Sequence, residues 1–121
     1  MGSPGVVVFP ERGARVDVEI VEKPEEQRRG LSGRTELPEN SGMVFWLGHR
    51  DYHAFWMGGC KIPLDLIHVD YGRVVGMISL SPGDQQTYKI DRPSSIVLEV
   101  NGGWAARHGV QVGDQVQISL A

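Results

Sequence analysis

The chain has 121 residues, of which 40% are hydrophobic and 22% charged, and its formal net charge is −3 at pH 7. This length fits one domain, and a chain of this size buries enough surface to fold without a disulfide or a structural metal. A single cysteine excludes a disulfide within the chain and any zinc site built on several cysteines. Because the net charge is not positive, we expect no nucleic-acid partner.

The start of the chain leaves the location open. No window approaches the run of about 18 apolar residues that a membrane-spanning helix needs, so we predict no transmembrane span. The first five residues lack the basic segment and long apolar stretch of a secretory signal, which favours a cytoplasmic protein. Met1-Gly2-Ser3 is equally the kind of start left on a chain whose leader has been removed, and in that case we expect an exported protein.

The first half of the chain predicts strands and one short helix. Unbroken apolar runs at residues 6–9 and 43–47 predict strands covered on both faces. Strict alternation at residues 16–20 predicts a half-buried strand. Between them, residues 24–29 predict a helix that begins at a proline, carries acids in its first turn and arginines in its last, and ends at Gly30.

The second half predicts further strands. Residues 66–78 predict a hairpin whose tight loop is closed by Gly72 with a positive φ angle. Residues 95–100 and 115–120 predict two more strands, and residues 104–108 a helix of one or two turns. Many short strands with frequent turns predict an all-β fold with one or two short helices, as an antiparallel β-sandwich or a partly open barrel, in a single domain over residues 1–121.

A series of short motifs forms one ordered pattern. The motifs are Glu26 and Arg28 before Gly30-Leu31-Ser32-Gly33-Arg34, then Gly42-Met43-Val44-Phe45, Phe55-Trp56-Met57, Ile62-Pro63-Leu64-Asp65, Leu98-Glu99-Val100-Asn101-Gly102-Gly103 and Gly113-Asp114. In this order and spacing the chain resembles the "domain of unknown function 192" family over about residues 16–120. These are small β-rich proteins of bacteria and archaea with no established biochemical role. The resemblance implies a jelly-roll-like sandwich, and because many relatives look exported or lipid-anchored, it also favours a removed leader.

The chain departs from the usual pattern of this family at two places. Ser32 stands where the family usually has Met after Gly-Leu. Gly58-Gly59-Cys60 stands where the family usually has Lys-Asn-Thr. If those three polar residues belong to a family site, that part of the site is absent from this chain.

Three charged residues from the matching motifs form the first candidate site: Arg34, Asp65 and Glu99. Both acids have apolar neighbours, so each either faces solvent from a strand or is held by a partner. Arg34 is the natural partner, because a guanidinium can pair with carboxylates through two parallel hydrogen bonds. The trio is then a structural ion-pair cluster, a polar pocket for a ligand such as a sugar, or the acid and base of a hydrolase.

Five aromatic residues fall in one region: Trp46, Tyr52, Phe55, Trp56 and Tyr71. Exposed indole and phenol rings stack well on sugar faces or peptide side chains. Aromatic side chains also dominate the cores of β-sandwiches, and we favour this core-filling interpretation for the set.

Histidine, methionine and cysteine side chains gather in the same region: His49, His53, Met57 and Cys60, with His68 beyond. Imidazole, thioether and thiol are the ligands that copper(I) prefers. Nothing in the sequence fixes them in one coordination shell, so we favour scattered histidines with a small buried thiol, and predict no metal and no cofactor.

Cys60 is also a possible nucleophile. Lys61 beside it would lower the pKa of the thiol electrostatically. Nucleophilic catalysis also requires a base held in place by a third group, and the sequence does not place His53 or His68 against the thiol.

We therefore predict a non-enzymatic domain that binds a small polar or carbohydrate-like ligand. Its pocket is predicted to be lined by Arg34, Asp65 and Glu99, with Trp56 as the apolar wall. The first alternative is a hydrolase that uses Asp65 and Glu99 as acid and base. The second is an accessory or assembly protein in which the charged trio is purely structural. The sequence predicts neither the identity of the ligand nor the oligomeric state.

Overall fold

The computed structural model describes residues 2–121, so the hypothesis about the start of the chain, where it concerns Met1, lies outside the described residues. Most elements are strands, accompanied by two short α-helices and one 3₁₀ turn. They are β1 (Ser3–Phe9), η1 (Pro10–Arg12), β2 (Ala14–Val21), α1 (Pro24–Arg29), β3 (Ser41–Asp51), β4 (Phe55–Trp56), β5 (Leu64–Asp70), β6 (Arg73–Leu80), β7 (Thr87–Tyr88), β8 (Ser94–Asn101), α2 (Trp104–Arg107) and β9 (Gln117–Leu120). The predicted mainly β fold with short helices is confirmed.

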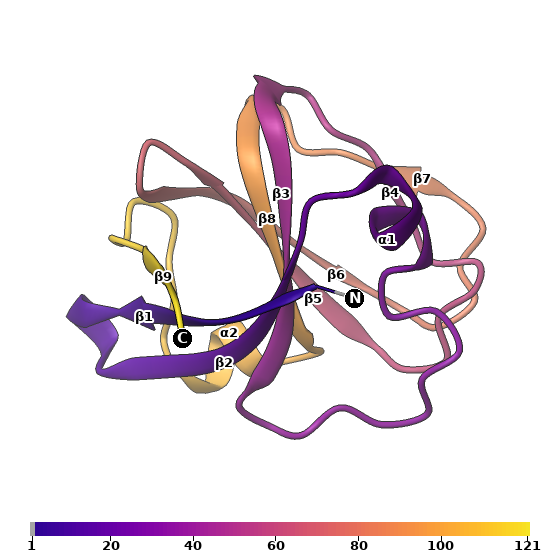
Figure 1. Cartoon of the computed structure of the whole chain (residues 1–121), viewed down its shortest axis with the longest axis horizontal. Helices are drawn as coiled ribbons and strands as arrows, with labels where there is room; N and C mark the ends of the chain where they lie inside the picture. Colours follow the sequence, from indigo (N-terminus) through magenta and orange to yellow (C-terminus); the bar gives the residue numbers. More distant parts are fainter. Residues whose placement is uncertain (1) are drawn as a thin grey trace.

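Seven strands form one sheet in the order β6-β5-β8-β3-β2-β1-β9, and β4 and β7 form a separate two-stranded sheet. In Figure 1, β3 and β8 run together through the middle, with β1, β2 and β9 to the left and α1, β4 and β7 to the right. The neighbours in the large sheet pair antiparallel except β2 and β3, which are parallel. A parallel pair needs a long return connection, and α1 with the loop after it supplies one.

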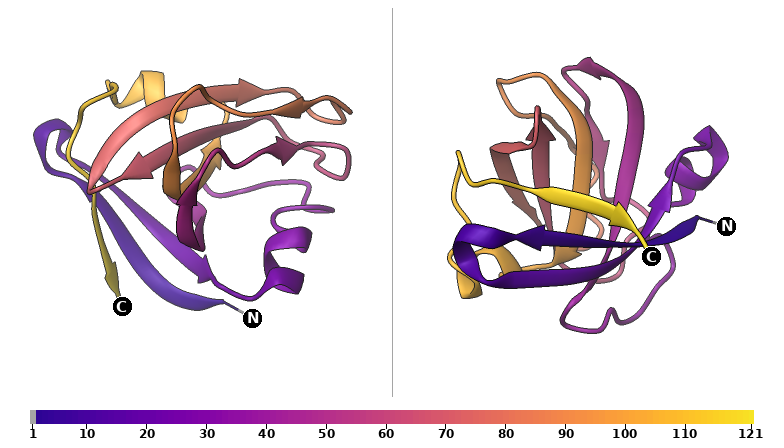
Figure 2. Two further views of the ribbon diagram at one scale, coloured as in Figure 1. Left: turned by 90° about the horizontal axis from the view of Figure 1, so that it is seen from above. Right: turned by 60° about the vertical axis from the view of Figure 1, so that its left-hand side comes forward.

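The large sheet is strongly curved but not closed into a barrel, in agreement with the predicted sandwich or partly open barrel (Figure 2). Its outer strands β6 and β9 approach each other at one end. There the N–H of Val74 donates to the Asp114 carbonyl at 2.9 Å, and the N–H of Gly113 donates to the Val74 carbonyl at 2.8 Å. The N–H of Val116 also donates to the Gly72 carbonyl at 2.8 Å. These bonds join β6 to the segment before β9 and leave the rest of the two edges apart.

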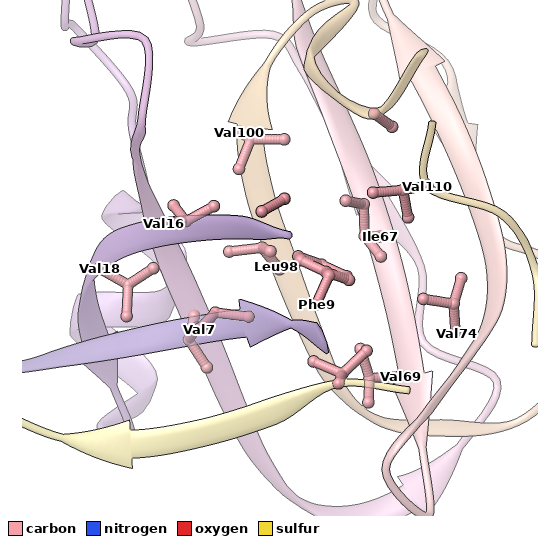
Figure 3. Close-up of a cluster of buried hydrophobic side chains, with 14 of the residues drawn as sticks. Val7, Phe9, Val16, Val18, Ile67, Val69, Val74, Leu98, Val100 and Val110 are labelled. Carbon is pink, nitrogen blue, oxygen red and sulfur yellow. The ribbon is translucent and has the colours of Figure 1, made fainter. Parts of the chain in front are cut away.

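Both faces of the central strands are covered. One face carries Leu98 and Val100 and packs on β1, β2 and α2, around a core that includes Phe9 and Trp104 (Figure 3). The other face carries Val97 and belongs to a second core that reaches beneath α1, β4 and β7. As a result, all seven residues of β5 are buried, charged ones included. Two acidic side chains, Asp65 and Glu99, are buried on opposite faces of this sheet.

The local predictions hold well. Helix α1 begins at Pro24, and Gly30 follows its last residue. The Gly30 N–H donates to the Glu26 carbonyl at 2.9 Å. The predicted hairpin is formed by β5 and β6, and Gly72 has φ 71°. Tyr71 also has a positive φ of 49°, since a two-residue type I′ loop requires it at both central positions.

Three features differ from the predictions. The run at residues 6–9 is covered on one face, because β1 lies near the open edge: Val7 and Phe9 are buried, whereas Val6 and Val8 are half-buried. The last strand starts two residues later than predicted, at Gln117. Strands β4 and β7 were not predicted, because each is two residues long and too short to show a pattern.

Candidate functional site

A cleft of about 470 Å³ opens beside the second core. Its lining comes from α1 and the three residues after it, from β3, from residues 53–56, and from Cys60 and Glu99. The walls combine apolar side chains such as Phe45, Leu47 and Phe55 with polar ones that include Arg28, Arg29 and His53. A concave site in which apolar walls surround placed polar groups is a common form of small-molecule site.

Glu99 is the acidic side chain in this cleft among the described residues, and it is only 6% exposed. In the sheet it lies opposite Met43 of β3 and Leu66 of β5, so its side chain shares their apolar face. Its Oε1 atom accepts no hydrogen bond from the described residues. Burial raises the pKa of the Glu99 carboxyl to about 8, so the group is mainly neutral at pH 7. A neutral carboxyl presents one hydrogen-bond donor and one acceptor.

Cys60 lies in the same cleft and is half-buried. Burial is the main cause that raises the pKa of its thiol, the nearby Glu99 carboxyl raises it further, and a hydrogen bond from Ser32 opposes them. The predicted lowering of this pKa by Lys61 is therefore wrong, because burial and Glu99 raise it. The thiol is protonated at neutral pH, which argues against an activated nucleophile.

The ordinary pKa of a cysteine thiol is 9.0, and that of Cys60 is higher. We accordingly expect alkylation of Cys60 by iodoacetamide to accelerate only as the pH rises above 9. The rate should be followed by mass spectrometry on the folded protein, with Cys60→Ser as the blank. A half-maximal rate at neutral pH would show that the thiol is activated after all.

The turn before Cys60 shapes one wall of the cleft. The N–H of Cys60 donates to the Met57 carbonyl at 3.0 Å, which closes the turn around Gly58 and Gly59. The Gly33 N–H donates to the Gly59 carbonyl at 3.0 Å and ties the turn to the loop after α1.

A Cβ atom on either glycine of this turn would require a neighbouring side chain to move. A Cβ atom on Gly58 would overlap the six-membered ring of Trp56. A Cβ atom on Gly59 would stand 2.6 Å from the Ser32 hydroxyl oxygen. The two glycines therefore let Trp56 and Ser32 pack directly on the backbone.

Most of the aromatic set does not fill the core, so our core-filling interpretation is wrong for four of its members. Trp46, Tyr52, Trp56 and Tyr71 are exposed, Tyr71 to 85%, whereas Phe55 is half-buried. Trp46 lies on β3, Tyr52 on the β3–β4 connection, Trp56 on β4 and Tyr71 in the β5–β6 loop. Of the whole set, Phe55 and Trp56 line the cleft, and Trp56 is the exposed one of the two.

Asp65 has a structural environment. Its carboxylate accepts hydrogen bonds from the Ser79 hydroxyl at 2.7 Å and from the N–H groups of Gly103 and Ala105 at 3.1 Å each. The last two groups stand at the start of α2, so Asp65 caps that helix from a neighbouring strand. Asp65 pairs with Val100, and its side chain points to the first core.

The structure does not bring the predicted charged trio together. Asp65 and Glu99 extend from adjacent strands to opposite faces of the sheet, since Asp65 lies opposite Val100 and Glu99 opposite Leu66. Arg34 lies 3.5 Å from Glu19, and the predicted pairing of Arg34 with Asp65 or Glu99 is not formed. Neither a shared acid–base pair nor a structural ion-pair cluster is built from these three residues. Of the four predicted site residues, Trp56 and Glu99 share the cleft.

The side chains considered as copper(I) ligands are dispersed. The rings of His49 and His53 lie 4.9 Å apart, while Met57 is buried in the second core. His68 is fully buried with its ring edge-on to Phe55, and burial lowers its pKa to about 4. Within residues 2–121, no three His, Cys, Asp or Glu side chains are arranged to hold a metal ion.

Comparison with known proteins places the chain. Residues 7–118 match the family model DUF192, described as "Uncharacterized ACR, COG1430". The chain belongs to the DUF192 family. No curated protein matches this DUF192 chain. None of the helices formed by residues 2–121 has the length and apolar character needed to cross a membrane.

Two solved structures resemble this DUF192 protein. One is a protein of unknown function from Novosphingobium aromaticivorans DSM 12444, with a TM-score of 0.85 and 37% identity, over 94% of this chain and 83% of that one. The other is a "putative transcription regulator" from Sinorhizobium meliloti 1021, with a TM-score of 0.89 and 24% identity, over 97% of this chain and 95% of that one. At this identity the second likeness concerns the fold alone.

The two departures of this DUF192 chain from its family pattern meet in the cleft. Ser32 hydrogen-bonds to Cys60 and lies against Gly59, so the two positions are neighbours. Sequence reasoning noted both departures but left Ser32 out of the candidate site. Because Ser32 and Gly58-Gly59-Cys60 both depart from the same family pattern, the two departures could have been predicted to lie together. Sequence reasoning also did not identify Phe45 and Phe55 as walls of the cleft, because a buried aromatic residue and one that lines a cleft look alike in sequence.

Proposed function

We propose that this protein is a non-enzymatic binding domain whose cleft takes a small polar or carbohydrate-like ligand. The observation that carries the proposal is the buried Glu99 carboxyl, which faces an open cleft with one oxygen unpaired among the described residues. A buried polar group without a partner costs about 1–3 kcal/mol. A ligand that supplies the missing hydrogen bond recovers this free energy.

The proposed binding set differs from the one expected from the sequence. Glu99 and Trp56 are retained as the polar floor and the apolar wall. Ser32 joins them, since it lines the cleft beside Cys60. Arg34 and Asp65 are left out, because their partners are Glu19 and the start of α2.

Two broader predictions from the sequence remain part of the proposal. We take residues 1–121 to act as a single β-rich domain of jelly-roll-like character. We also retain the absence of a nucleic-acid partner, because a net charge of −3 gives no attraction for phosphates. Because the similar structure from Sinorhizobium meliloti is described as a "putative transcription regulator", DNA binding by this chain is worth testing directly. A DNA-binding titration at low salt should show no saturable complex.

The test is a screen by NMR with monosaccharides, sugar acids and small neutral amides. We expect at least one compound to bind, with shifts confined to residues around Glu99 and Trp56. Saturation at 100 times the dissociation constant should raise the free energy of unfolding by about 2.7 kcal/mol. Ala54→Trp, which fills the cleft from an exposed lining position, should abolish the shifts.

Ala106→Trp is the matched control for this screen, because Ala106 is exposed on α2 and does not line the cleft. This variant should bind like the unmodified protein. Binding that survives Ala54→Trp would place the ligand elsewhere on the molecule and contradict the proposal.

A further inference from the structure

Trp56 is held as a rigid platform at the cleft. Its indole N–H donates to the Gln85 carbonyl at 3.0 Å, which fixes the rotation of the ring. The ring packs on Gly58, where no Cβ atom could fit. The residue is nevertheless 58% exposed and lines the cleft. An exposed indole whose orientation is fixed in advance loses little freedom when a flat group stacks on it.

The remaining walls also suit a flat apolar body. Phe45 and Phe55 meet edge to face, with ring centroids 5.7 Å apart and an interplanar angle of 88°. A sugar presents hydroxyl groups around its whole rim, and each needs a polar partner when buried. In this cleft the polar lining side chains are those of Gln27, Arg28, Arg29, Ser32, His53, Cys60 and Glu99, whereas Phe45, Phe55 and Trp56 supply three aromatic rings. Three aromatic rings offer stacking and edge contacts to a flat ring, so an aromatic ring is the ligand class that uses these walls most fully.

The floor of the cleft selects the edge of that ring. The Glu99 carboxyl is buried and unpaired at Oε1, and in its neutral form it offers a donor and an acceptor side by side. An amide or a ring lactam offers the complementary acceptor and donor at the same spacing. Arg28 and Arg29 also line the cleft and disfavour a cation.

We propose that the cleft accepts a planar aromatic ring that carries an amide or lactam edge, with the ring stacked on Trp56 and the edge paired with Glu99. This inference rests on the proposed function and narrows its ligand class. Stacking supplies the apolar part of the affinity, and the paired hydrogen bonds orient the ring.

The test uses three matched probes in NMR titrations of the full chain at neutral pH. Benzamide has both the flat ring and the amide edge, cyclohexanecarboxamide keeps the edge without the flat ring, and N,N-dimethylbenzamide keeps the ring without the N–H donor. The readout is the indole N–H signal of Trp56 together with the backbone signals of the cleft. Benzamide should bind about five-fold or more tightly than either analogue.

Substitutions at Glu99 separate hydrogen bonding from charge. Glu99→Gln keeps one donor and one acceptor and should retain benzamide binding, whereas Glu99→Leu should lose it. In the unmodified protein the affinity should fall above a pH of about 8, as the carboxyl ionises. The titratable and charged groups that face Glu99 across the cleft are Cys60, His53, Arg28 and Arg29.

Controls assign the pH dependence to one group. Glu99→Gln should remove the decline in affinity, and Cys60→Ser should leave it in place. Trp56→Leu should bring benzamide and cyclohexanecarboxamide to equal affinity. Gly58→Ala should shift the indole signal and weaken benzamide without touching the floor of the cleft.

The outcomes distinguish the two proposals. If cyclohexanecarboxamide binds as tightly as benzamide, or if sugars move the Trp56 signal and benzamide does not, the aromatic-amide class is wrong and small-ligand binding stands. If benzamide binds equally well to Glu99→Leu, the assigned pairing is wrong. If neither the amides nor the sugars move any cleft signal up to their solubility limits, both proposals fail.

Discussion

The free energy of unfolding should decrease as the pH rises from about 5 to about 8, because the Glu99 carboxyl ionises in the unfolded chain while burial keeps it neutral in the folded protein. Burial raises the pKa of folded Glu99 to about 8 from an ordinary value of 4.5. An acidic group whose pKa is higher in the folded protein than in the unfolded chain contributes stability that is fully present below the unfolded pKa. That stability is lost as the pH rises to the folded pKa. At about 1.4 kcal/mol per pH unit, the loss is on the order of 4 kcal/mol. That is a large part of the total of about 5–15 kcal/mol for a folded protein.

Urea unfolding across this pH range, on the unmodified protein and Glu99→Gln, measures the effect. The two proteins should have similar stability near pH 5, and Glu99→Gln should be more stable by several kcal/mol above pH 8. His68 makes the free energy of unfolding change in the opposite direction at lower pH. Its pKa is lowered to about 4 in the folded protein, so the stability that it contributes is lost as the pH falls. Because both proteins contain His68, the difference between the curves isolates Glu99. Parallel curves would mean that Glu99 is ionised in the folded protein.

The second large effect is expected for Asp65→Ala, which should lower the free energy of unfolding by about 3 kcal/mol or more. The substitution leaves the N–H groups of Gly103 and Ala105 without their acceptor beneath α2, and removes the bond from Ser79. Asp65→Asn keeps one acceptor oxygen and should cost less. Urea unfolding at neutral pH measures both variants.

Asp17→Ala is the matched control for Asp65→Ala. Asp17 is exposed on β2, where its contact with Arg15 is 3.4 Å long and solvent-screened, so its removal should cost less than about 1 kcal/mol. An equal cost for the two substitutions would remove the capping role of Asp65. Because Asp65 does not line the cleft, a folded Asp65→Asn protein should keep the ligand affinity of the unmodified protein.

Much of the secondary structure follows from short-range rules that the sequence states directly. The alternation of residues 16–20 places their apolar side chains on one face whatever the sheet around them, and β2 forms there. The proline, acids, arginines and glycine around residues 24–30 define α1 at both ends. The hairpin at Tyr71 and Gly72 is equally local, since its loop geometry depends on two residues.

The candidate site needed the tertiary structure. Asp65 and Glu99 look alike in sequence, each an acid between apolar neighbours, and only the pairing of β5 with β8 reveals that they point to opposite cores. Asp65 accepts hydrogen bonds from backbone N–H groups at the start of α2, whereas Oε1 of Glu99 accepts none from the described residues. Trp56 likewise lines a cleft because the turn at Gly58 folds under its ring, a contact that no pattern of alternation encodes.

The sequence by itself therefore determined the β-rich class, the family, the single helix before β3 and the hairpin, because these depend on neighbours along the chain. The tertiary structure alone decided which charged residue is a cap and which is the floor of a cleft. The physical reason is that the environment of a buried charge is set by residues from other strands. Ser79 of β6 and the start of α2 reach Asp65 from other parts of the chain, whereas the apolar neighbours of Glu99 come from β3 and β5.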